Sequence, residues 1–197
     1  RSLVGSEMCI RDSLSELNAA GPEVLFALHS LLDRHRKLEL PNGEVLSLRE
    51  DTYIFGTMNP TSLRDYAGTQ SLNKAFADRW VIWDKPFPNK EQLDAIFEKR
   101  YPKLQKEYRE LIIKLATEIN NSFMSDDISI NIETPMSLRT IVERIPIGLD
   151  VYTDSADPLK DTWENFVLPH VNKEDLDHYK TLWNTIVRKG PSIKPKL

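Results

Sequence analysis

Two side chains near the middle of the chain have types and positions that suit ligand chemistry. Asn59 follows an apolar strand predicted over 52–58, and Arg79 stands at the far end of a short helix predicted over 71–77. Open α/β sheets bind their ligands at the carboxyl ends of their strands, so such a strand would deliver Asn59 to a site. An amide is a neutral hydrogen-bond donor, and a guanidinium is a planar cation that stabilises charge building up on phosphoryl oxygens.

These two motifs resemble the sensor and arginine-finger region of an AAA+ ATPase. The stretch Thr57-Met58-Asn59-Pro60 is similar to the Thr-x-Asn-Pro sensor of the MoxR, CbbQ and dynein-related (midasin-like) branch, and Asp78-Arg79-Trp80 is similar to its finger motif. The resemblance implies catalytic roles for both residues. Asn59 would hold the attacking water or the γ-phosphate, and Arg79 would reach the nucleotide of a neighbouring subunit. An Asn-Pro turn and an Asp-Arg surface ion pair are the ordinary alternatives.

The resemblance also implies roles for two charged residues elsewhere. Glu16 stands where the family has the second acid of the Walker B motif, the catalytic carboxylate that polarises the attacking water. Ser15 occupies the place of the first acid, which holds Mg²⁺ through its water shell, so the sequence departs from the family there. Arg139 is similar to the sensor-two arginine and is expected to bind the nucleotide. A solvated charge on or near a helix is the alternative for Glu16 and for Arg139.

The elements that would position these residues follow from hydrophobic periodicity and from capping and turn signals. Before the Pro86-Phe87-Pro88 segment, the predicted elements are a helix over 22–35, hairpin strands over 37–40 and 44–48, a buried strand over 52–58, a helix over 71–77 and a strand over 80–83. After it, helices are predicted over 90–100, along a stripe from 104 to 119, and over 137–145, 159–168 and 172–187. Asn89 and Gln92 should form a capping box. Phe97, Tyr108, Trp163 and Trp183 should be core residues.

This order predicts an α/β fold. The resemblance implies the C-terminal half of a P-loop AAA+ domain, from Walker B to the arginine finger, over 14–88, followed by an α-helical lid over 89–197. Residues 1–13 resemble a sequencing-adapter artefact, with a native disordered tail as the alternative. No GxxxxGK[ST] phosphate loop occurs in the chain. Because this family has such a loop several tens of residues before Glu16, we expect the chain to be truncated at its N-terminus.

Composition sets further bounds. The chain has 197 residues, of which 40% are apolar and 28% charged, as in a soluble globular protein, and it contains no apolar run long enough to span a membrane. A net charge of −4 argues against a nucleic-acid partner, and the basic tail 188–196 is predicted to be frayed. Cys9 is the only cysteine, which suits the cytoplasm. Among the four histidines only His29 and His35 come near to a metal-ligand spacing, and no metal site is expected.

The function that the resemblance implies is that of a larger protein. It would be an ATP-hydrolysing homo-oligomer, a hexameric ring, that uses ATP and Mg²⁺ to remodel or mature protein partners, some of which carry a von Willebrand A domain. Without a phosphate loop this chain alone should be inactive and should aggregate through exposed strand edges. Two alternatives stay open, namely a McrB-like restriction subunit that uses GTP and a catalytically silent helical interaction module.

Overall fold

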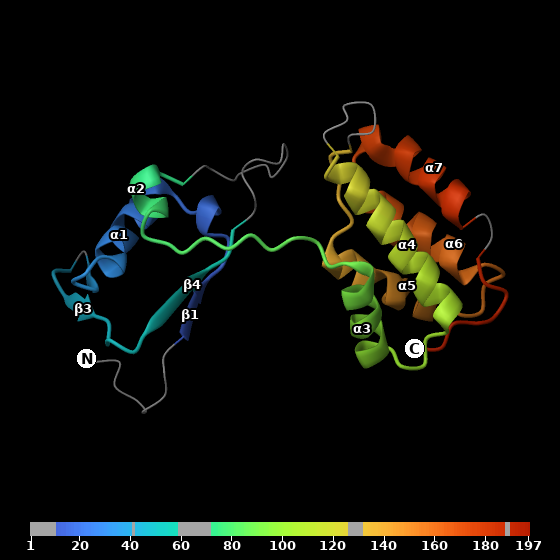
Figure 1. Ribbon diagram of the computed structural model, residues 1–197, viewed down its shortest axis with the longest axis horizontal. Coiled ribbons are helices and arrows are strands. Elements are labelled where there is room, and N and C mark those ends of the chain that lie inside the picture. The colour runs from blue at the N-terminus through green and yellow to red at the C-terminus, as the bar shows by residue number, and fades with distance from the viewer. Residues whose placement is uncertain (1–10, 41, 59–71, 126–131, 188–189) are drawn as a thin grey trace. The chain divides into compact units, whose positions relative to one another are not determined.

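The chain divides into two compact units in a computed structural model (Figure 1), namely Arg1–Asp84 and Lys85–Leu197. The structure describes residues 11–40, 42–58, 72–125, 132–187 and 190–197. The sequence placed the division at 86–88, a few residues further along the chain.

In its described residues, the first unit combines a parallel strand pair, a hairpin and two α-helices (Figure 1). Its elements are β1 (Arg11–Leu14), a 3₁₀ turn (Leu17–Ala19), α1 (Pro22–Leu32), β2 (Lys37–Glu39), β3 (Val45–Ser47), β4 (Tyr53–Gly56) and α2 (Lys74–Ala77). β1 pairs with β4 in parallel, with Leu14 opposite Gly56. α1 begins at Pro22 as predicted, because proline suits the first helical position. The first three residues of β1 belong to the segment that the sequence assigned to a non-native tail.

The hairpin of β2 and β3 is antiparallel and turns at Asn42-Gly43, as predicted. Gly43 has a φ of 81°, which glycine adopts without steric cost, and the Asn42 side chain accepts a hydrogen bond from the Glu44 N–H at 3.0 Å. Arg36 ties the start of the hairpin to the segment that leads into β4. Its guanidinium donates to the carbonyl of Glu50 at 3.0 Å and to the carbonyl of Thr52.

Two predictions about strands in this unit are wrong. β4 forms where a strand was predicted, but it is not buried, because Tyr53 and Phe55 are exposed. The strand predicted over 80–83 does not form, and Val81 and Trp83 are 99% and 93% exposed. Parallel strands are normally covered on both faces and paired on both edges. Among the described residues β4 pairs only with β1, and residues 81–83 join neither strand.

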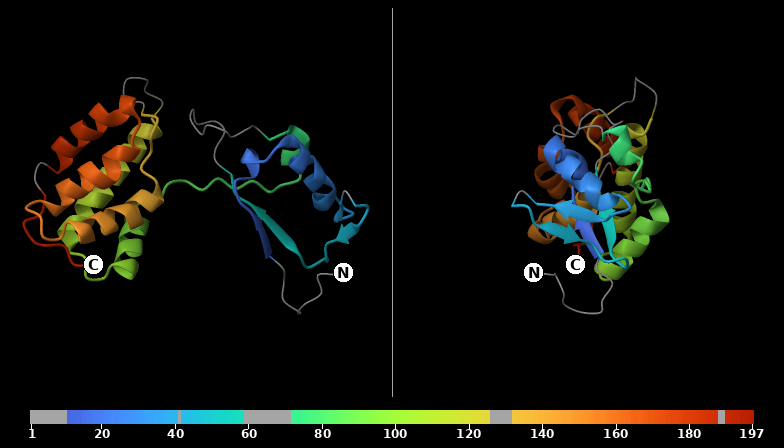
Figure 2. Two further views of the ribbon diagram at one scale, coloured as in Figure 1. Left: turned by 180° about the vertical axis from the view of Figure 1, so that it is seen from behind. Right: turned by 90° about the vertical axis from the view of Figure 1, so that its left-hand side faces the viewer.

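The second unit is helical in the residues described, and α3 and α7 both pack on the long helix α4 (Figure 2). Its elements are α3 (Lys90–Arg100), α4 (Lys106–Phe123), a π-helical segment (Thr140–Arg144), α5 (Ile145–Val151), α6 (Pro158–Thr162), a second π-helical segment (Trp163–Val167), 3₁₀ turns (Leu168–His170 and Lys173–Asp175) and α7 (Leu176–Ile186). The predicted capping box at the start of α3 is confirmed, with Asn89 and Gln92 each accepting the other's backbone N–H.

The second unit has an aromatic core. The four aromatic side chains that the sequence assigned to the core, Phe97, Tyr108, Trp163 and Trp183, are buried. The Trp163 ring stacks on Trp183 and on Tyr179, with ring centroids 5.0 and 5.8 Å apart. Rings at these separations stabilise a core beyond the area that they bury.

Residues 190–197, here called the C-terminal strap, are bound to the helices of this unit. The Gln105 side-chain amide donates to the carbonyl of Lys194 at 2.7 Å and accepts a backbone N–H of the strap at 3.2 Å. The Tyr108 hydroxyl donates to the carbonyl of Ile193 at 2.8 Å. The prediction of a frayed basic tail is therefore wrong for these residues. The error arose because the contacts join residues far apart in sequence.

Candidate active site

The carboxyl ends of β1 and β4 lie side by side. The Leu17 N–H donates to the carbonyl of Thr57 at 2.8 Å, and the Thr57 N–H donates to the carbonyl of Leu14 at 2.9 Å, so the pairing continues past both strands. Glu16 is thereby placed next to Thr57. Asn59, two residues further on, lies outside the described residues. The structure thus brings Glu16 to the strand end from which the chain leads directly to Asn59.

Glu16 has a left-handed backbone conformation, with φ 55° and ψ 45°. This conformation costs a residue other than glycine about 1–2 kcal/mol. It persists where the surroundings fix it, and such positions are frequent at active sites. Here the two hydrogen bonds that flank Glu16, from the Leu17 N–H to Thr57 and from the Ala19 N–H to the Glu16 carbonyl, hold the turn. The Glu16 side chain is exposed.

Gly56, the last residue of β4, is the point at which three segments meet. A Cβ atom at this position would lie 3.1 Å from the Leu17 side chain and 3.3 Å from the ring of Trp80. Glycine therefore allows the Leu17 and Trp80 side chains to approach the strand closely. Because Trp80 directly follows Arg79, its packing on Gly56 brings the finger motif to the strand end that leads to Asn59.

Arg79 lies two residues after the end of the one-turn helix α2. Its guanidinium is held by two partners. Its Nε lies 2.8 Å from Asp33 Oδ1 and its Nη2 lies 3.3 Å from Asp33 Oδ2, while Nη1 donates to the carbonyl of Ala75. The surface ion pair that the sequence left open thus exists, with Asp33 as the partner. The hydrogen bond from Arg79 lowers the pKa of the Asp33 carboxyl below its ordinary value.

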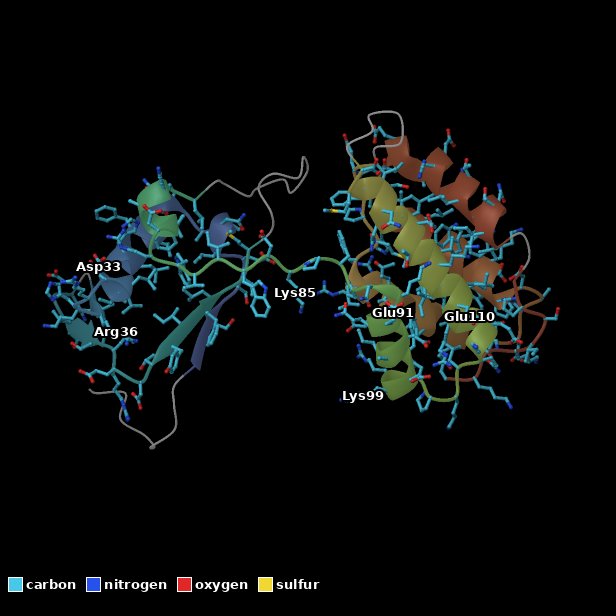
Figure 3. The ribbon with its side chains drawn as sticks, in the orientation of Figure 1. Asp33, Arg36, Lys85, Glu91, Lys99 and Glu110 are labelled. Carbon is cyan, nitrogen blue, oxygen red and sulfur yellow. The ribbon has the colours of Figure 1, made fainter. Side chains whose placement is uncertain are left out.

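Ring contacts fix α1 against α2. The His29 ring lies 5.0 Å from the Phe76 ring, and Phe76 lies 5.9 Å from Trp80 in an edge-on arrangement. Phe76 is fully buried. Asp33 follows His29 by one helical turn, at the end of α1 (Figure 3), so this packing keeps the carboxylate beside Arg79.

Arg139 belongs to the second unit, so its position relative to Glu16 and Arg79 stays a prediction. Its side chain is exposed, and it immediately precedes the π-helical segment that begins at Thr140. π-Helical turns occur frequently at functional sites. Here the segment is braced by the Tyr101 hydroxyl, which donates to the carbonyl of Val142 at 2.8 Å.

The described residues contain neither a metal cluster nor a membrane-spanning helix. In the part of the chain that the structure describes, no three His, Cys, Asp or Glu side chains gather into a metal cluster. Within the same residues, no helix has the length and apolar character needed to cross a membrane.

One known protein family matches the part of the chain that contains these two strand ends. Residues 13–80 match the family described as AAA domain (dynein-related subfamily). The chain belongs to the AAA+ ATPases, in their dynein-related branch. The matched range begins in β1 and ends at Trp80, so it includes Glu16, Asn59 and Arg79 and leaves Arg139 outside.

Individual relatives agree with this family. The chain is 30% identical to midasin of Giardia intestinalis over an alignment of 144 residues. This alignment covers 68% of this chain and 3% of that protein. The chain is 38% identical over 88 residues to midasin of Dictyostelium discoideum, 44% of this chain and 2% of that protein. It is 28% identical over 137 residues to the aerobic cobaltochelatase subunit CobS of Sinorhizobium sp, 64% of this chain and 40% of that protein.

The chain thus corresponds to a small part of each midasin and to less than half of CobS. The match to the Giardia protein covers more of the chain than the first unit contains, so the similarity continues into the helical unit.

Sequence reasoning missed two residues of this site. Asp33 was missed because it lies 46 positions from Arg79, and no local spacing connects an acid at the end of one helix with a cation after another. Gly56 lies inside the apolar run that predicts a strand over 52–58. A glycine between apolar strand residues is a signal of close approach, and it could have suggested that something packs there.

Proposed function

We propose that this chain is the segment of an AAA+ ATPase that runs from the Walker B motif to the arginine finger, followed by the α-helical lid. The complete protein is a hexameric ring of identical subunits that hydrolyses ATP to remodel or mature protein partners in the cytoplasm. The observation that carries the proposal is the convergence at Gly56. Segments next to Glu16, Asn59 and Arg79 meet there, within the range that matches the dynein-related AAA domain.

The residues at the strand ends fit the phosphate end of a nucleotide. ATP with Mg²⁺ supplies the phosphoryl group that is transferred to water. The Arg79 guanidinium has five N–H donors, and its contacts with described residues use three of them. Its side chain is partly exposed. A planar cation with donors to spare can stabilise the charge that develops on phosphoryl oxygens, and we assign it to the nucleotide of a neighbouring subunit.

Glu16 and Asn59 act on the attacking water in this proposal. The carboxylate of Glu16 is exposed beside the strand end and accepts a proton from the water, while the amide of Asn59 orients it. Arg139 contacts the nucleotide from the lid. The described residues fit the metal less well, because the hydroxyl of Ser15 stands where a carboxylate is expected.

The partner in this proposal is a protein, in some cases one with a von Willebrand A domain. The relatives support assembly with other chains in one respect, since CobS is described as a subunit of an aerobic cobaltochelatase.

The test is to replace Arg79 by Ala in the complete ring protein. Turnover of ATP should fall about 10³-fold while ATP binding is nearly unchanged, because the finger acts mainly on the transition state. Arg49→Ala is the matched control, since Arg49 is also an arginine of the first unit that pairs with an aspartate, Asp51, at 2.8 Å. It should leave turnover unchanged. Retained turnover in Arg79→Ala would remove the finger role and favour a catalytically silent module.

Mixed rings test whether Arg79 acts on a neighbouring subunit. Rings of Arg79→Ala subunits and rings of Glu16→Gln subunits should each be inactive. When the two are mixed, a Glu16→Gln subunit supplies its finger to an Arg79→Ala neighbour that still has its catalytic carboxylate. ATPase activity should therefore partly return, and no return at any mixing ratio would contradict action between subunits.

A further inference from the structure

Arg79 is held along one edge of its guanidinium. The Nε and Nη2 atoms face the two oxygens of Asp33, in the bidentate geometry that gives an Arg–carboxylate pair its directionality. Nη1 adds a hydrogen bond to the carbonyl of Ala75. Three donors are thus used among the described residues. One N–H remains on each of Nη1 and Nη2.

The element that carries Arg79 is too short to hold such a side chain by itself. α2 has four residues, and Arg79 stands two residues after its end. An unrestrained arginine side chain has about 2 kcal/mol of rotamer entropy, and a cation that must wait for a developing charge loses effect if it must first be ordered. A partner outside α2 is therefore needed to keep the guanidinium in one orientation.

Asp33 is such a partner because its own backbone is fixed independently of Arg79. Its N–H donates to the carbonyl of His29 at 3.0 Å, which closes α1, and its carbonyl accepts the Arg36 N–H at 3.0 Å. The contact of the His29 ring with buried Phe76 then sets α1 against α2. The carboxylate therefore projects from a defined helix end (Figure 3).

We propose that Asp33 is the positioning residue of the arginine finger. Its carboxylate fixes one edge of the Arg79 guanidinium and leaves the remaining N–H donors for the phosphoryl oxygens of a nucleotide on a neighbouring subunit. This inference rests on the proposed function of Arg79. Asp33 touches neither nucleotide nor water in it, and acts only through Arg79.

The experiment measures ATP turnover in the complete ring protein for Asp33→Asn, Asp33→Glu, Arg79→Ala and the double variant Asp33→Asn with Arg79→Ala. Asp33→Asn should lower kcat about 10-fold to 100-fold with little change in KM, because a misoriented catalytic group costs rate more than binding. Asp33→Glu keeps the carboxylate and should recover part of kcat. The double variant should be no slower than Arg79→Ala, because a residue that acts only through Arg79 has no effect once Arg79 is gone.

Asp51→Asn is the matched control. Asp51 is as exposed as Asp33, at 45% against 46%, and it also pairs with an arginine in the first unit. Its replacement should leave kcat unchanged.

The outcomes separate the two proposals. If Arg79→Ala keeps its turnover, the finger assignment itself fails. If Arg79→Ala is slow but Asp33→Asn has unchanged or higher kcat, the finger stands and the positioning role is overturned. A double variant that is slower than Arg79→Ala, or an Asp33→Asn protein that no longer forms rings, would make Asp33 a structural residue and would also overturn it.

Discussion

A single buried carboxylate holds two loops of the second unit together. Asp175 accepts hydrogen bonds from the backbone N–H groups of Glu133 and Thr134, the latter at 2.7 Å. In Asp175→Ala the partly buried N–H of Thr134 loses this acceptor, which should lower the free energy of unfolding by about 1–3 kcal/mol. Urea denaturation followed by tryptophan fluorescence measures the change. Glu174→Ala, the adjacent exposed acid, is the control, and an equal loss in both variants would contradict the assignment.

For the residues of the site, the sequence alone identifies candidates but does not give their backbone conformations or their partners. The sequence indicates Arg79 through its position after a short helix and through its motif, and it indicates Glu16 only through the resemblance to the Walker B motif. Both signals are local to a short stretch of the chain. Neither the left-handed conformation of Glu16 nor the pairing of Arg79 with Asp33 could be read in this way, because each is set by a segment distant in sequence. Arg139 lies in the other unit, so its role stays a prediction.

At the scale of elements, the C-terminal strap should respond to high pH through Tyr108. Burial, with a smaller contribution from the negative charges of Asp157 and Glu107, raises the pKa of Tyr108 from 10.0 to about 12. A pKa raised by folding means that the protonated hydroxyl stabilises the folded state. This stabilisation is complete below pH 10 and is lost as the pH rises towards 12. The phenolate also cannot donate to the carbonyl of Ile193, so the strap should detach over the same interval.

The measurement compares the wild type with Tyr108→Phe in urea between pH 8 and 12. The variant should be less stable by about 1 kcal/mol at pH 8, where the hydroxyl donates a hydrogen bond. The difference between the two proteins should shrink as the pH rises through 10. Tyr179, whose pKa burial also raises, is present in both proteins and does not affect the difference. A constant difference over the whole range would exclude the role given to the Tyr108 hydroxyl.

The elements that were predicted correctly are those with local causes. The capping box of α3 needs only Asn89 and Gln92, and the hairpin needs only a turn that accepts positive φ at Gly43. The predicted strand at 80–83 failed because a strand also needs a neighbour. The helix predicted over 137–145 is largely π-helical, and its register is braced by Tyr101 from another element. Periodicity within a segment contains no information about such partners.

At the scale of the whole molecule, the two units differ in how they bury apolar surface. The described helices of the second unit enclose a core of buried aliphatic and aromatic side chains. In the first unit α1 has no buried residue, and Phe26, Phe55, Val81 and Trp83 are all exposed. Isolated strand edges and large exposed apolar surfaces favour association between molecules. The stability of this chain should therefore come mainly from the second unit.

We expect the 197-residue chain to self-associate, and the segment 85–197 to stay monomeric and unfold in one cooperative transition. Analytical ultracentrifugation and calorimetry of both proteins measure this, and the midpoint of the segment should reappear in the full chain. Replacing Val81 and Trp83 by Ser should reduce association, because both side chains are almost fully exposed. Met124→Ser, which removes an exposed apolar side chain from the second unit, should have little effect. A monomeric full chain that unfolds in a single transition would contradict this expectation, and would mean that the first unit contributes to the stability of the folded chain together with the second.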